Sequence, residues 1–389
     1  MKREAVIVSA VRTPIARIGG ALASMDAHVF GAEAIKEAVR RAKIPPELID
    51  DVIFGNVLSG GGNIARLTAL EANLPIEIPG VTVDRQCGSG INAVALAAQA
   101  IVAGAGDVYI AGGTESMSRA PFLMERTYRP FSMDPPRFIT ARSSPDSIGD
   151  PPMGITAENL AKKYNISRKE QDEYAYLSQM RMAKAMEESR FDEQIVPVKV
   201  PGKKGESIIF DTDEHPRPQT TIEGLSKLPP VFLKDGTVTA GTSSGINDAA
   251  SALVLMSREK ANEFGLEILA VVKQYAVSGV DPNIMGIGPV PATKKVLEKS
   301  NLTLDDIDLV ELNEAFASQV IACNRELQID IEKLNVNGGA ISHGHPLGAT
   351  GAILTTKAIY ELRRTDKNRA LITACIGGGQ GIALIIERN

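Results

Sequence analysis

Hydrophobic and polar residues follow one another along the chain in blocks that predict strands followed by helices. Residues 5–10 form an apolar run that predicts a buried strand, and residues 32–42 carry apolar side chains at helical spacing with charges between them. Residues 49–56 and 107–113 predict two further strands. Strands that alternate with helices in this way are typical of an α/β protein, and we expect a mainly parallel sheet.

One stretch breaks this pattern with a cysteine. A short apolar strand at residues 81–83 leads to Cys87, and Gly88-Ser89-Gly90 follows before an alanine-rich segment that predicts a buried helix at residues 91–101. The unpaired N–H groups of a helix N-terminus favour the thiolate form of a thiol beside them. A lone cysteine is more often an inert core residue. The glycines after Cys87 favour a reactive thiol instead, because they let a substrate approach the backbone.

The second half of the chain repeats the first. Residues 34–52 align with residues 292–310, and the same offset carries Cys87 onto His345. Small residues also follow His345 and open an apolar helix, and the next strand mirrors the one at residues 107–113. The repeat indicates a duplicated α/β unit. We therefore expect Cys87 and His345 to lie on equivalent turns that face each other.

An insertion separates the two halves. Between about Thr114 and Ser243 the chain is polar and rich in proline, methionine and arginine, and residues 157–188 predict a polar helix with Ser167 as a candidate N-cap. A loose cluster of basic residues and one histidine lies in this insertion and is a candidate phosphate site, although such clusters are usually solvated faces. Its members are Lys203, Lys204, His215 and Arg217.

Composition and charge narrow the class of protein. The chain has 389 residues, of which 44% are hydrophobic and 23% charged, as is typical of a soluble globular protein with two or three domains or one duplicated domain. A net charge of −5 disfavours a nucleic-acid binder. Three cysteines fit a reducing compartment better than a disulfide framework. No targeting segment or membrane-length apolar run of roughly 20 residues is evident, so we expect a cytoplasmic protein.

Other polar residues stand where predicted strands meet glycine-rich turns. Asn313 follows one apolar run, His343 and His345 share one turn, and Cys375 precedes Gly377 at the end of another strand. Two of the four histidines in one such turn favour catalysis over a structural role. Cys323 lacks this context and is predicted to be a core residue.

These residue types suit acyl transfer. A cysteine activated by a histidine attacks a thioester or ketone carbonyl and holds the acyl group, which are roles for Cys87 and His345. A second cysteine, Cys375, can move a proton at a carbon next to a carbonyl. The backbone N–H groups of Cys87 and Gly377, and a water held by Asn313, are candidate donors to the oxyanions that form.

Several motifs in this order resemble those of the thiolases, along the whole chain. They are Cys87-Gly88-Ser89-Gly90, Thr239-Ala240-Gly241, Asn313-Glu314-Ala315-Phe316, Gly338-Gly339-Ala340, Gly344-His345-Pro346 and Cys375-Ile376-Gly377-Gly378-Gly379. The resemblance implies a five-layered αβαβα fold from two similar halves, and a homodimer or homotetramer. We expect an N-terminal half at 1–114 and 244–265, an inserted loop domain at 115–243 and a C-terminal half at 266–389.

The resemblance also implies roles for residues at matching positions. Cys87 would be the acylated nucleophile, His345 its activator, Cys375 the acid and base at carbon, and Asn313 the holder of the oxyanion water. Contacts with coenzyme A or its acyl group would come from Arg217, Ala240, Ser244, Met153, Phe232 and Met285. Coenzyme A would be a substrate, acetyl-CoA and acyl-CoA would be its partners, and no metal or redox cofactor is implied.

Alternatives concern the acyl group and the reaction class. We expect exchange of two acetyl-CoA with acetoacetyl-CoA and CoA. The runner-up is a broad-chain 3-ketoacyl-CoA thiolase of fatty-acid breakdown, since Pro152 stands where acetoacetyl-specific members tend to carry histidine. His343 is grouped with the predicted substrate contacts, although it stands where many members have an apolar residue and its role is open. A decarboxylating condensing enzyme is disfavoured because such enzymes lack a second catalytic cysteine. A non-catalytic thiolase-like lipid-binding protein is disfavoured because the set Cys87, His345 and Cys375 is complete.

Overall fold

The strands form one long mixed sheet in which each half of the chain makes a block. The computed structural model describes residues 3–60, 62–127, 129, 131, 133, 135–202 and 205–389. The strand order is β12-β13-β14-β11-β1-β10-β5-β3-β4, and the two blocks meet where β1 pairs with β11 over two residues, Val6 and Ile7. The strands are β1 Ala5–Arg12, β3 Asp51–Gly55, β4 Gly80–Val83, β5 Val108–Ser116, β10 Asn247–Ser257, β11 Ala270–Gly279, β12 Leu309–Leu312, β13 Arg369–Ile376 and β14 Gln380–Glu387.

The expectation of a mainly parallel sheet is wrong. Parallel pairing joins β3 to β4 and β5, and β12 to β13, whereas β10 is antiparallel to β1 and β5, and β14 is antiparallel to β11 and β13. The glycine-rich turn at 377–379 is the reason for one of these pairs, because a short turn can join only antiparallel neighbours. Helices connect the parallel pairs, and short turns or long excursions connect the others.

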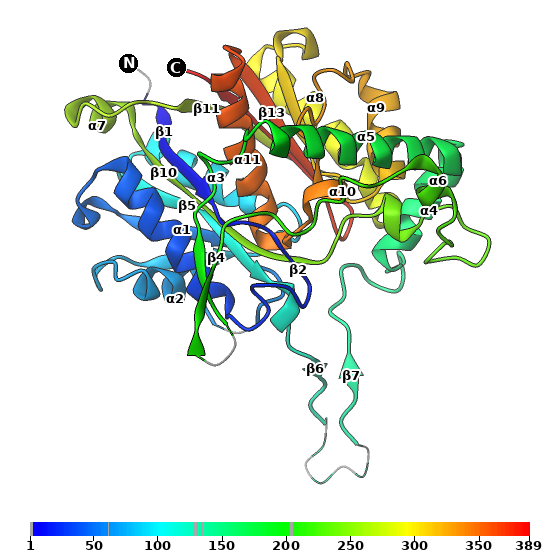
Figure 1. Ribbon diagram of the computed structural model, residues 1–389. Helices are drawn as coiled ribbons and strands as arrows, with labels where there is room; N and C mark the ends of the chain where they lie inside the picture. The colour runs from blue at the N-terminus through cyan, green and yellow to red at the C-terminus, as the bar shows by residue number, and fades with distance from the viewer. Residues whose placement is uncertain are drawn as a thin grey trace.

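Helices lie in three layers around the two blocks (Figure 1). The outer pair α1 (Ala27–Ala42) and α2 (Ile64–Glu71) covers the first block, and the outer pair α8 (Pro289–Ser300) and α9 (Ala317–Leu327) covers the second. The apolar core between the blocks is filled by α3 (Ser89–Ala103) and α11 (Leu347–Arg364). This arrangement confirms the predicted five-layered αβαβα fold.

The two central helices touch backbone to backbone at a pair of glycines. A Cβ atom on Gly90 would lie 2.7 Å from the backbone nitrogen of Ala352, and one on Gly351 would lie 2.2 Å from that of Ile91. Only glycine lets two helices approach this closely. Gly55, at the end of β3, lies between the first turns of both helices. A Cβ on Gly55 would lie 2.8 Å from the Cβ of Ser89 and 2.4 Å from the carbonyl oxygen of Gly348. The residues that precede α3 and α11 are therefore brought together.

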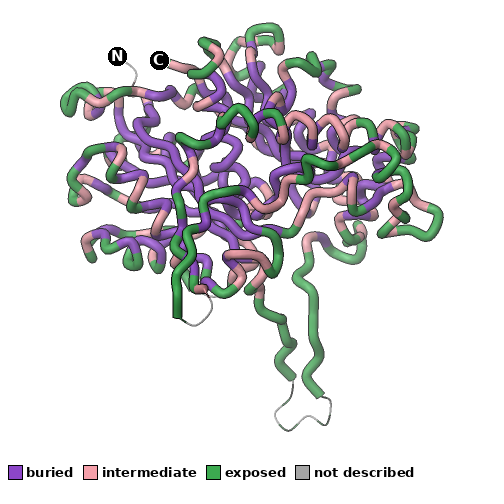
Figure 2. The backbone as a smooth tube through the Cα atoms, viewed as in Figure 1, coloured by how far each residue is buried: buried purple, intermediate pink, exposed green. Residues whose placement is uncertain are grey.

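The segment between the halves lies over this core and adds a projecting hairpin. Its elements are β6 Leu123–Met124, β7 Phe138–Ile139, α4 Met153–Lys163, α5 Arg168–Glu187, β8 Val198–Pro201, β9 Ser207–Phe210 and α6 Ile222–Ser226. The hairpin of β6 and β7 extends away from the body and is exposed along its length (Figures 1 and 2). Shorter elements elsewhere are β2 Ala16–Arg17, α7 Arg258–Glu263 and α10 Ala340–His343.

The single helix predicted at 157–188 is two helices. Asn165 adopts a left-handed φ of 51° after α4, which a continuing helix does not allow. Ser167 then caps α5 as predicted, in a capping box that it forms with Glu170. The break lets α4 pack against α9 while α5 packs against α10.

One segment is long and apolar enough by composition to span a membrane, at residues 86–103, within the residues that the structure describes. It contains α3, and 61% of it is buried inside the protein. Its apolar character is accounted for by the central layer, where both faces of the helix meet a sheet or another helix.

Candidate active site

Cys87 lies on a tight turn between β4 and α3. Gln86 has a left-handed φ of 46°, and the Ser89 hydroxyl closes the turn by accepting from the Arg85 N–H at 2.9 Å and donating to the Gln86 carbonyl at 2.6 Å. The strained conformation of Gln86 directs the turn toward the end of β13. The backbone N–H groups of Gly377 and of Cys87 itself face the sulfur.

Burial of the Cys87 thiol opposes the effect that was expected from the helix N-terminus. Burial raises the pKa of Cys87 to about 11, and the backbone N–H of Gly377 opposes this shift without cancelling it. The negative charges of Glu115 and Asp84 raise the pKa of Cys87 further. The thiol is therefore protonated at neutral pH, and a base must remove its proton before it can attack a carbonyl.

His345 lies on the turn that opens α11, the counterpart of the Cys87 turn. Its Nδ1 atom is 2.7 Å from the Thr350 hydroxyl, which itself donates to the Pro346 carbonyl at 2.9 Å. A hydroxyl that already donates can only accept from Nδ1–H, so Nε2 carries the lone pair. Burial lowers the pKa of His345 to about 4, so the ring is neutral at pH 7. His345 Nε2 is thus free to act as a base, on the turn that opens the helix packed against α3.

Asn313 directs its side chain at the same ring. It follows β12, and its Nδ2 atom lies 3.4 Å from Nε2 of His345. The Asn313 Oδ1 atom is buried and has no hydrogen-bond partner among the described residues. A buried acceptor of this kind normally binds a water or a ligand group. Asn313 therefore has an acceptor atom free for a water, and its role as the holder of that water stays a prediction.

Cys375 is fully buried near the end of β13, among apolar side chains. Burial raises its pKa well above the usual value, and the neighbouring Cys87 adds to this shift. The cluster around it contains Met153, Ala157, Phe232, Val238, Met285, Ala315 and Phe316. Three of the predicted acyl-contact residues, Met153, Phe232 and Met285, are thus brought to Cys375. A thiol in this environment keeps its proton at neutral pH.

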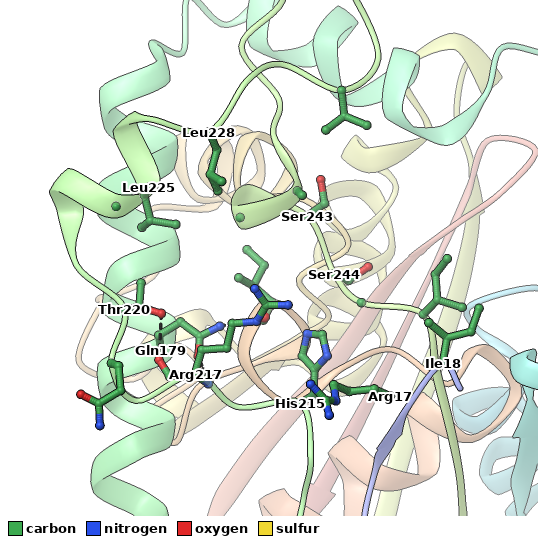
Figure 3. Close-up of a pocket in the computed structure, with 18 of the residues that line it drawn as sticks. Arg17, Ile18, Gln179, His215, Arg217, Thr220, Leu225, Leu228, Ser243 and Ser244 are labelled. Atoms are coloured by element: carbon green, nitrogen blue, oxygen red, sulfur yellow. Dashed lines mark hydrogen bonds between the residues drawn. The ribbon is translucent and has the colours of Figure 1, made fainter. Parts of the chain in front are cut away.

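A cleft of about 820 Å³ lies beside this centre (Figure 3). Four predicted contact residues line it, namely Arg217, Phe232, Ala240 and Ser244. Leu225 and Leu228 form an apolar wall, and Arg217 extends between that wall and His215. Phe232 belongs both to the cleft and to the apolar cluster around Cys375, so it connects the two.

The polar side of the cleft carries two arginines. Arg17, which sequence reasoning did not single out, lines the cleft with Arg217, and both are exposed. His215 lies between them, and burial followed by the charge of Arg217 lowers its pKa to about 4. Two of the four members of the predicted basic cluster, His215 and Arg217, therefore line the cleft. The other two, Lys203 and Lys204, lie outside the described residues.

His343 does not reach the cleft. It lies at the end of α10 and is 2% exposed, and neither ring nitrogen has a hydrogen-bond partner among the described residues. Burial and the charges of Lys357 and Arg12 hold its pKa well below the usual range. Its prediction as a contact residue is therefore wrong, and it is a neutral core residue behind the His345 turn. Cys323 is also in the core, as predicted.

Four residues that hold the site were missed by the sequence reasoning. Thr350 accepts from His345, Asn247 accepts from the His345 backbone N–H at 3.0 Å, and Glu115 and Glu314 bind the helix ends on either side of His345. Of these four residues, only Glu314 could have been identified from the sequence, because it stands next to Asn313 in one motif. Within the described residues, no group of three or more His, Cys, Asp and Glu side chains is arranged to hold a metal ion.

The duplicated fold and the two cysteines with a histidine and an asparagine define a member of the thiolase family. The family model for the thiolase N-terminal domain matches residues 5–259, and the model for the thiolase C-terminal domain matches residues 266–388. The chain therefore belongs to this family.

Individual relatives agree over the full length. An acetyl-CoA acetyltransferase of Syntrophomonas wolfei is 48% identical, with 100% of both chains covered. The crystal structure of the Bacillus anthracis acetyl-CoA acetyltransferase superposes with a TM-score of 0.94 at 42% identity, covering 100% of this chain and 99% of that one. Human mitochondrial 3-ketoacyl-CoA thiolase in complex with CoA gives a TM-score of 0.93 at 44% identity, covering 100% and 98%.

Proposed function

We propose that this protein is an acyltransferase that exchanges two acetyl-CoA with acetoacetyl-CoA and CoA through an acyl group on Cys87. The observation that carries this proposal is that Cys87 neighbours Cys375, while the neutral His345 stands on the turn that opens the helix packed against the Cys87 helix. Full-length relatives that are 48% and 42% identical are acetyl-CoA acetyltransferases. A thiol nucleophile, a neutral base and a second thiol are the groups that acyl transfer with carbon–carbon bond cleavage requires.

The first half-reaction cleaves the 3-oxoacyl thioester. His345 Nε2 takes the proton of Cys87, and the sulfur attacks the C3 carbonyl. The C2–C3 bond then breaks, the acyl group stays on Cys87, and the electron pair left on C2 takes the proton of Cys375, which releases acetyl-CoA. The high pKa of Cys375 suits this step, because a carbanion is a stronger base than a buried thiolate.

The second half-reaction restores the enzyme. The Cys375 thiolate takes the proton of the incoming CoA thiol, and the CoA sulfur attacks the acyl group on Cys87. Cys87 leaves and takes back the proton that His345 held. Oxyanions form at the thioester and ketone oxygens, and a water on Asn313 with the N–H of Gly377 would donate to them. Every proton in this scheme moves between groups of the chain and the substrates, so we propose that no metal or redox cofactor takes part.

The cleft supports coenzyme A as the carrier of the acyl group. Arg17 and Arg217 supply positive charge for phosphates at its mouth, and Leu225, Leu228 and Phe232 supply an apolar path toward Cys375. A charged end and an apolar path match a phosphorylated nucleotide joined to a pantetheine arm. Ala240 and Ser244 line the same path, as the resemblance implied.

The chain-length alternative is retained because the chain also resembles a 3-ketoacyl-CoA thiolase over its full length. Pro152 caps α4 immediately before Met153, so the pocket lacks a histidine at this position. The test is CoA-dependent thiolysis of acetoacetyl-CoA, 3-ketohexanoyl-CoA and 3-ketodecanoyl-CoA, compared by kcat/KM. Preference for acetoacetyl-CoA supports the acetyltransferase. Equal or better cleavage of the longer chains replaces it with the broad-chain enzyme, and no cleavage of any of them overturns both.

We further propose that the protein assembles with copies of itself as a homodimer or homotetramer. The hairpin of β6 and β7 exposes 90% of Phe122 and 71% of Phe138, whose rings stack edge to face 5.8 Å apart. Strand β4 is also an edge of the sheet, with Val81 exposed. Such surfaces favour burial against another chain. Sedimentation of the wild type beside Phe138→Asp tests this. A monomeric wild type contradicts the proposal, and a smaller assembly in the variant assigns the hairpin to the interface.

The domain division and the compartment are proposed as well. We divide the chain at 1–114 with 244–265, 115–243 and 266–389, because β10 returns to the first block after the segment between the halves. All three cysteines are free thiols, which is compatible with the reducing cytoplasm. Fractionation of cells that express a tagged chain tests the compartment, and limited proteolysis tests the division.

A further inference from the structure

The turn that carries His345 is held by side chains from outside it. Gly344 has a φ of 102°, and a Cβ there would lie 2.4 Å from Cγ of Asn247. Asn247 accepts from the His345 N–H at 3.0 Å and donates to the Ala16 carbonyl at 3.0 Å. The turn lies between a helix of four residues, α10, and the start of α11. Its position therefore depends on what holds these two helix ends.

Glu115 holds the end on the α11 side. It is fully buried at the end of β5, and its Oε2 atom accepts from the Gly348 N–H at 2.8 Å and from the Val57 N–H at 3.0 Å. Its Oε1 atom accepts from the backbone N–H groups of Leu58 and Ser59 at 2.9 and 3.1 Å, and from the Ser59 hydroxyl at 2.8 Å. One carboxylate thus ties α11 to the loop after β3.

Glu314 holds the end on the α10 side. It is also fully buried, and its Oε2 atom accepts from the Ile341 N–H at 3.1 Å and the Ser178 hydroxyl at 2.7 Å. Its Oε1 atom accepts from the Tyr174 hydroxyl at 2.8 Å and the Asn335 amide at 2.9 Å. A Cβ on Gly339 would lie 2.3 Å from the Glu314 carboxyl carbon, so a glycine is needed at the start of α10.

The chemistry of both groups requires carboxylates. Each of the four oxygens accepts from two or more donors, and a glutamine would turn an NH₂ group toward some of them. The negative charge of Glu314 helps to raise the pKa of Tyr174 well above the usual value, although burial is the larger cause. Tyr174 therefore remains a donor to Glu314. Neither carboxylate touches the reacting atoms.

We propose that Glu115 and Glu314 are positioning residues that hold the His345 turn from its two sides, so that Nε2 stays in place beside Asn313. Glu314 is next to Asn313 in the chain, so this one carboxylate holds both Asn313 and the His345 turn in position. This inference rests on the proposed function, because it takes His345 as the base for Cys87. Misplacement of a catalytic group by about 1 Å costs on the order of 100-fold in rate.

The test uses Glu115→Gln and Glu314→Gln in the full chain, with Glu361→Gln as the matched control. Glu361 is also a buried carboxylate on α11, but it binds Asn337 and Arg364, away from the His345 turn. We expect kcat for thiolysis to fall about 100-fold in the first two variants with little change in KM, and the control to keep the wild-type rate. The rate at which iodoacetamide alkylates Cys87 at pH 7, followed on its peptide by mass spectrometry, is expected to fall in parallel.

A second measurement separates positioning from general loosening of the structure. In a His345→Ala background, Glu115→Gln and Glu314→Gln are expected to cause no further loss of Cys87 alkylation, because residues that act through one group are not additive. Losses that multiply in this background, or wild-type kcat in both glutamine variants, would overturn the proposal. Where a glutamine variant does not fold, Ser59→Ala and Ser178→Ala, which each remove one donor to these carboxylates, take its place with smaller expected losses.

The alkylation cycle also separates this proposal from the proposed function. A wild type that cleaves no 3-oxoacyl-CoA contradicts the acyltransferase. In such an inactive wild type, the alkylation rate of Cys87 is still expected to depend on His345. That rate alone then shows whether the glutamine variants add to the effect of His345→Ala.

Discussion

The Nδ1 atom of His345 lies 2.7 Å from the hydroxyl oxygen of Thr350, in the first turns of α11. Because that hydroxyl donates to the Pro346 carbonyl, it fixes the tautomer of the ring with the lone pair on Nε2. We expect Thr350→Val to lower kcat by about 10- to 100-fold while the KM for CoA changes little, since a proton on the wrong nitrogen removes the base.

Thr355→Val is the matched control for this change. Thr355 is equally buried on α11, and its hydroxyl also donates to the carbonyl four residues before it, at 2.8 Å from Gly351, but it does not contact His345. A loss of activity equal to that of Thr350→Val would assign the effect to helix stability rather than to the tautomer.

The pH dependence of acyl transfer follows from the buried histidine. Burial lowers the pKa of His345 to about 4, so the ring stays a base at all pH values above that. We expect the acid limb of kcat/KM for thiolysis to lie near pH 4 rather than near 6.5, the value of an exposed histidine. Each sample is returned to pH 7 and assayed again, which separates titration from unfolding. A limb near 6.5 would contradict the neutral buried ring.

Cys87→Ala is expected to abolish turnover and leave the fold intact. The side chain is half-buried on a turn whose hydrogen bonds come from Ser89 and the backbone, so its loss opens little core volume. Thiolysis of acetoacetyl-CoA measures the activity, and thermal unfolding measures the fold. Retained thiolysis would rule out Cys87 as the nucleophile.

Cys375→Ala separates the two half-reactions. Cys87 keeps its base in this variant, so we expect acetyl-CoA still to label Cys87, detected by mass spectrometry. Condensation of two acetyl-CoA is expected to be lost, because no group remains to take a proton from the acetyl carbon. If Cys87 is no longer labelled, Cys375 serves the first step as well.

His343 gives a prediction for stability. It is buried with neither ring nitrogen paired among the described residues, and unpaired buried polar atoms cost about 1–3 kcal/mol each. We expect His343→Met to raise the free energy of unfolding in urea by about 1 kcal/mol or more at pH 7.

The same variant is expected to change how the free energy of unfolding depends on pH. Burial holds the pKa of His343 well below its usual range, so below pH 6.5 the unfolded chain binds a proton that the folded chain refuses. The folded state therefore loses up to about 1.4 kcal/mol per pH unit below 6.5 through this residue. His343→Met is expected to lessen that loss between pH 6.5 and 5, and an unchanged slope would contradict the burial of a neutral ring.

The fold was predictable where apolar runs end at glycines. Strands β1 and β3 and the helix α3 lie within two residues of their predicted positions, and the repeat places α8 and β12 as counterparts of α1 and β3. The direction of β10 was not predictable, because it pairs antiparallel with β1 and β5, which lie far away in the chain. The direction of β14 relative to β13 had a local signal in the short turn at 377–379. The break before Ser167 had a local signal in Asn165, which tolerates left-handed backbone.

The site was predictable only in part. Cys87, His345 and Cys375 stand at strand or helix ends near glycines, Asn313 directly follows a strand, and the repeat aligned the first two. The ionisation of Cys87 could not be read from the sequence, because its pKa depends on how far the fold removes the sulfur from water. Glu115 was missed for a similar reason, since its partners come from loops far away in the chain.

The contact between Gly90 and Gly351 has a consequence for how variants of this protein would be classified. Each glycine abuts the backbone of the other helix, so a methyl group at either position meets backbone atoms that cannot rotate away and must push the helices apart. The turns that carry Cys87 and His345 would separate with them. A survey of inactive variants would therefore group these two positions with the catalytic residues, although they lie inside the protein and touch no substrate.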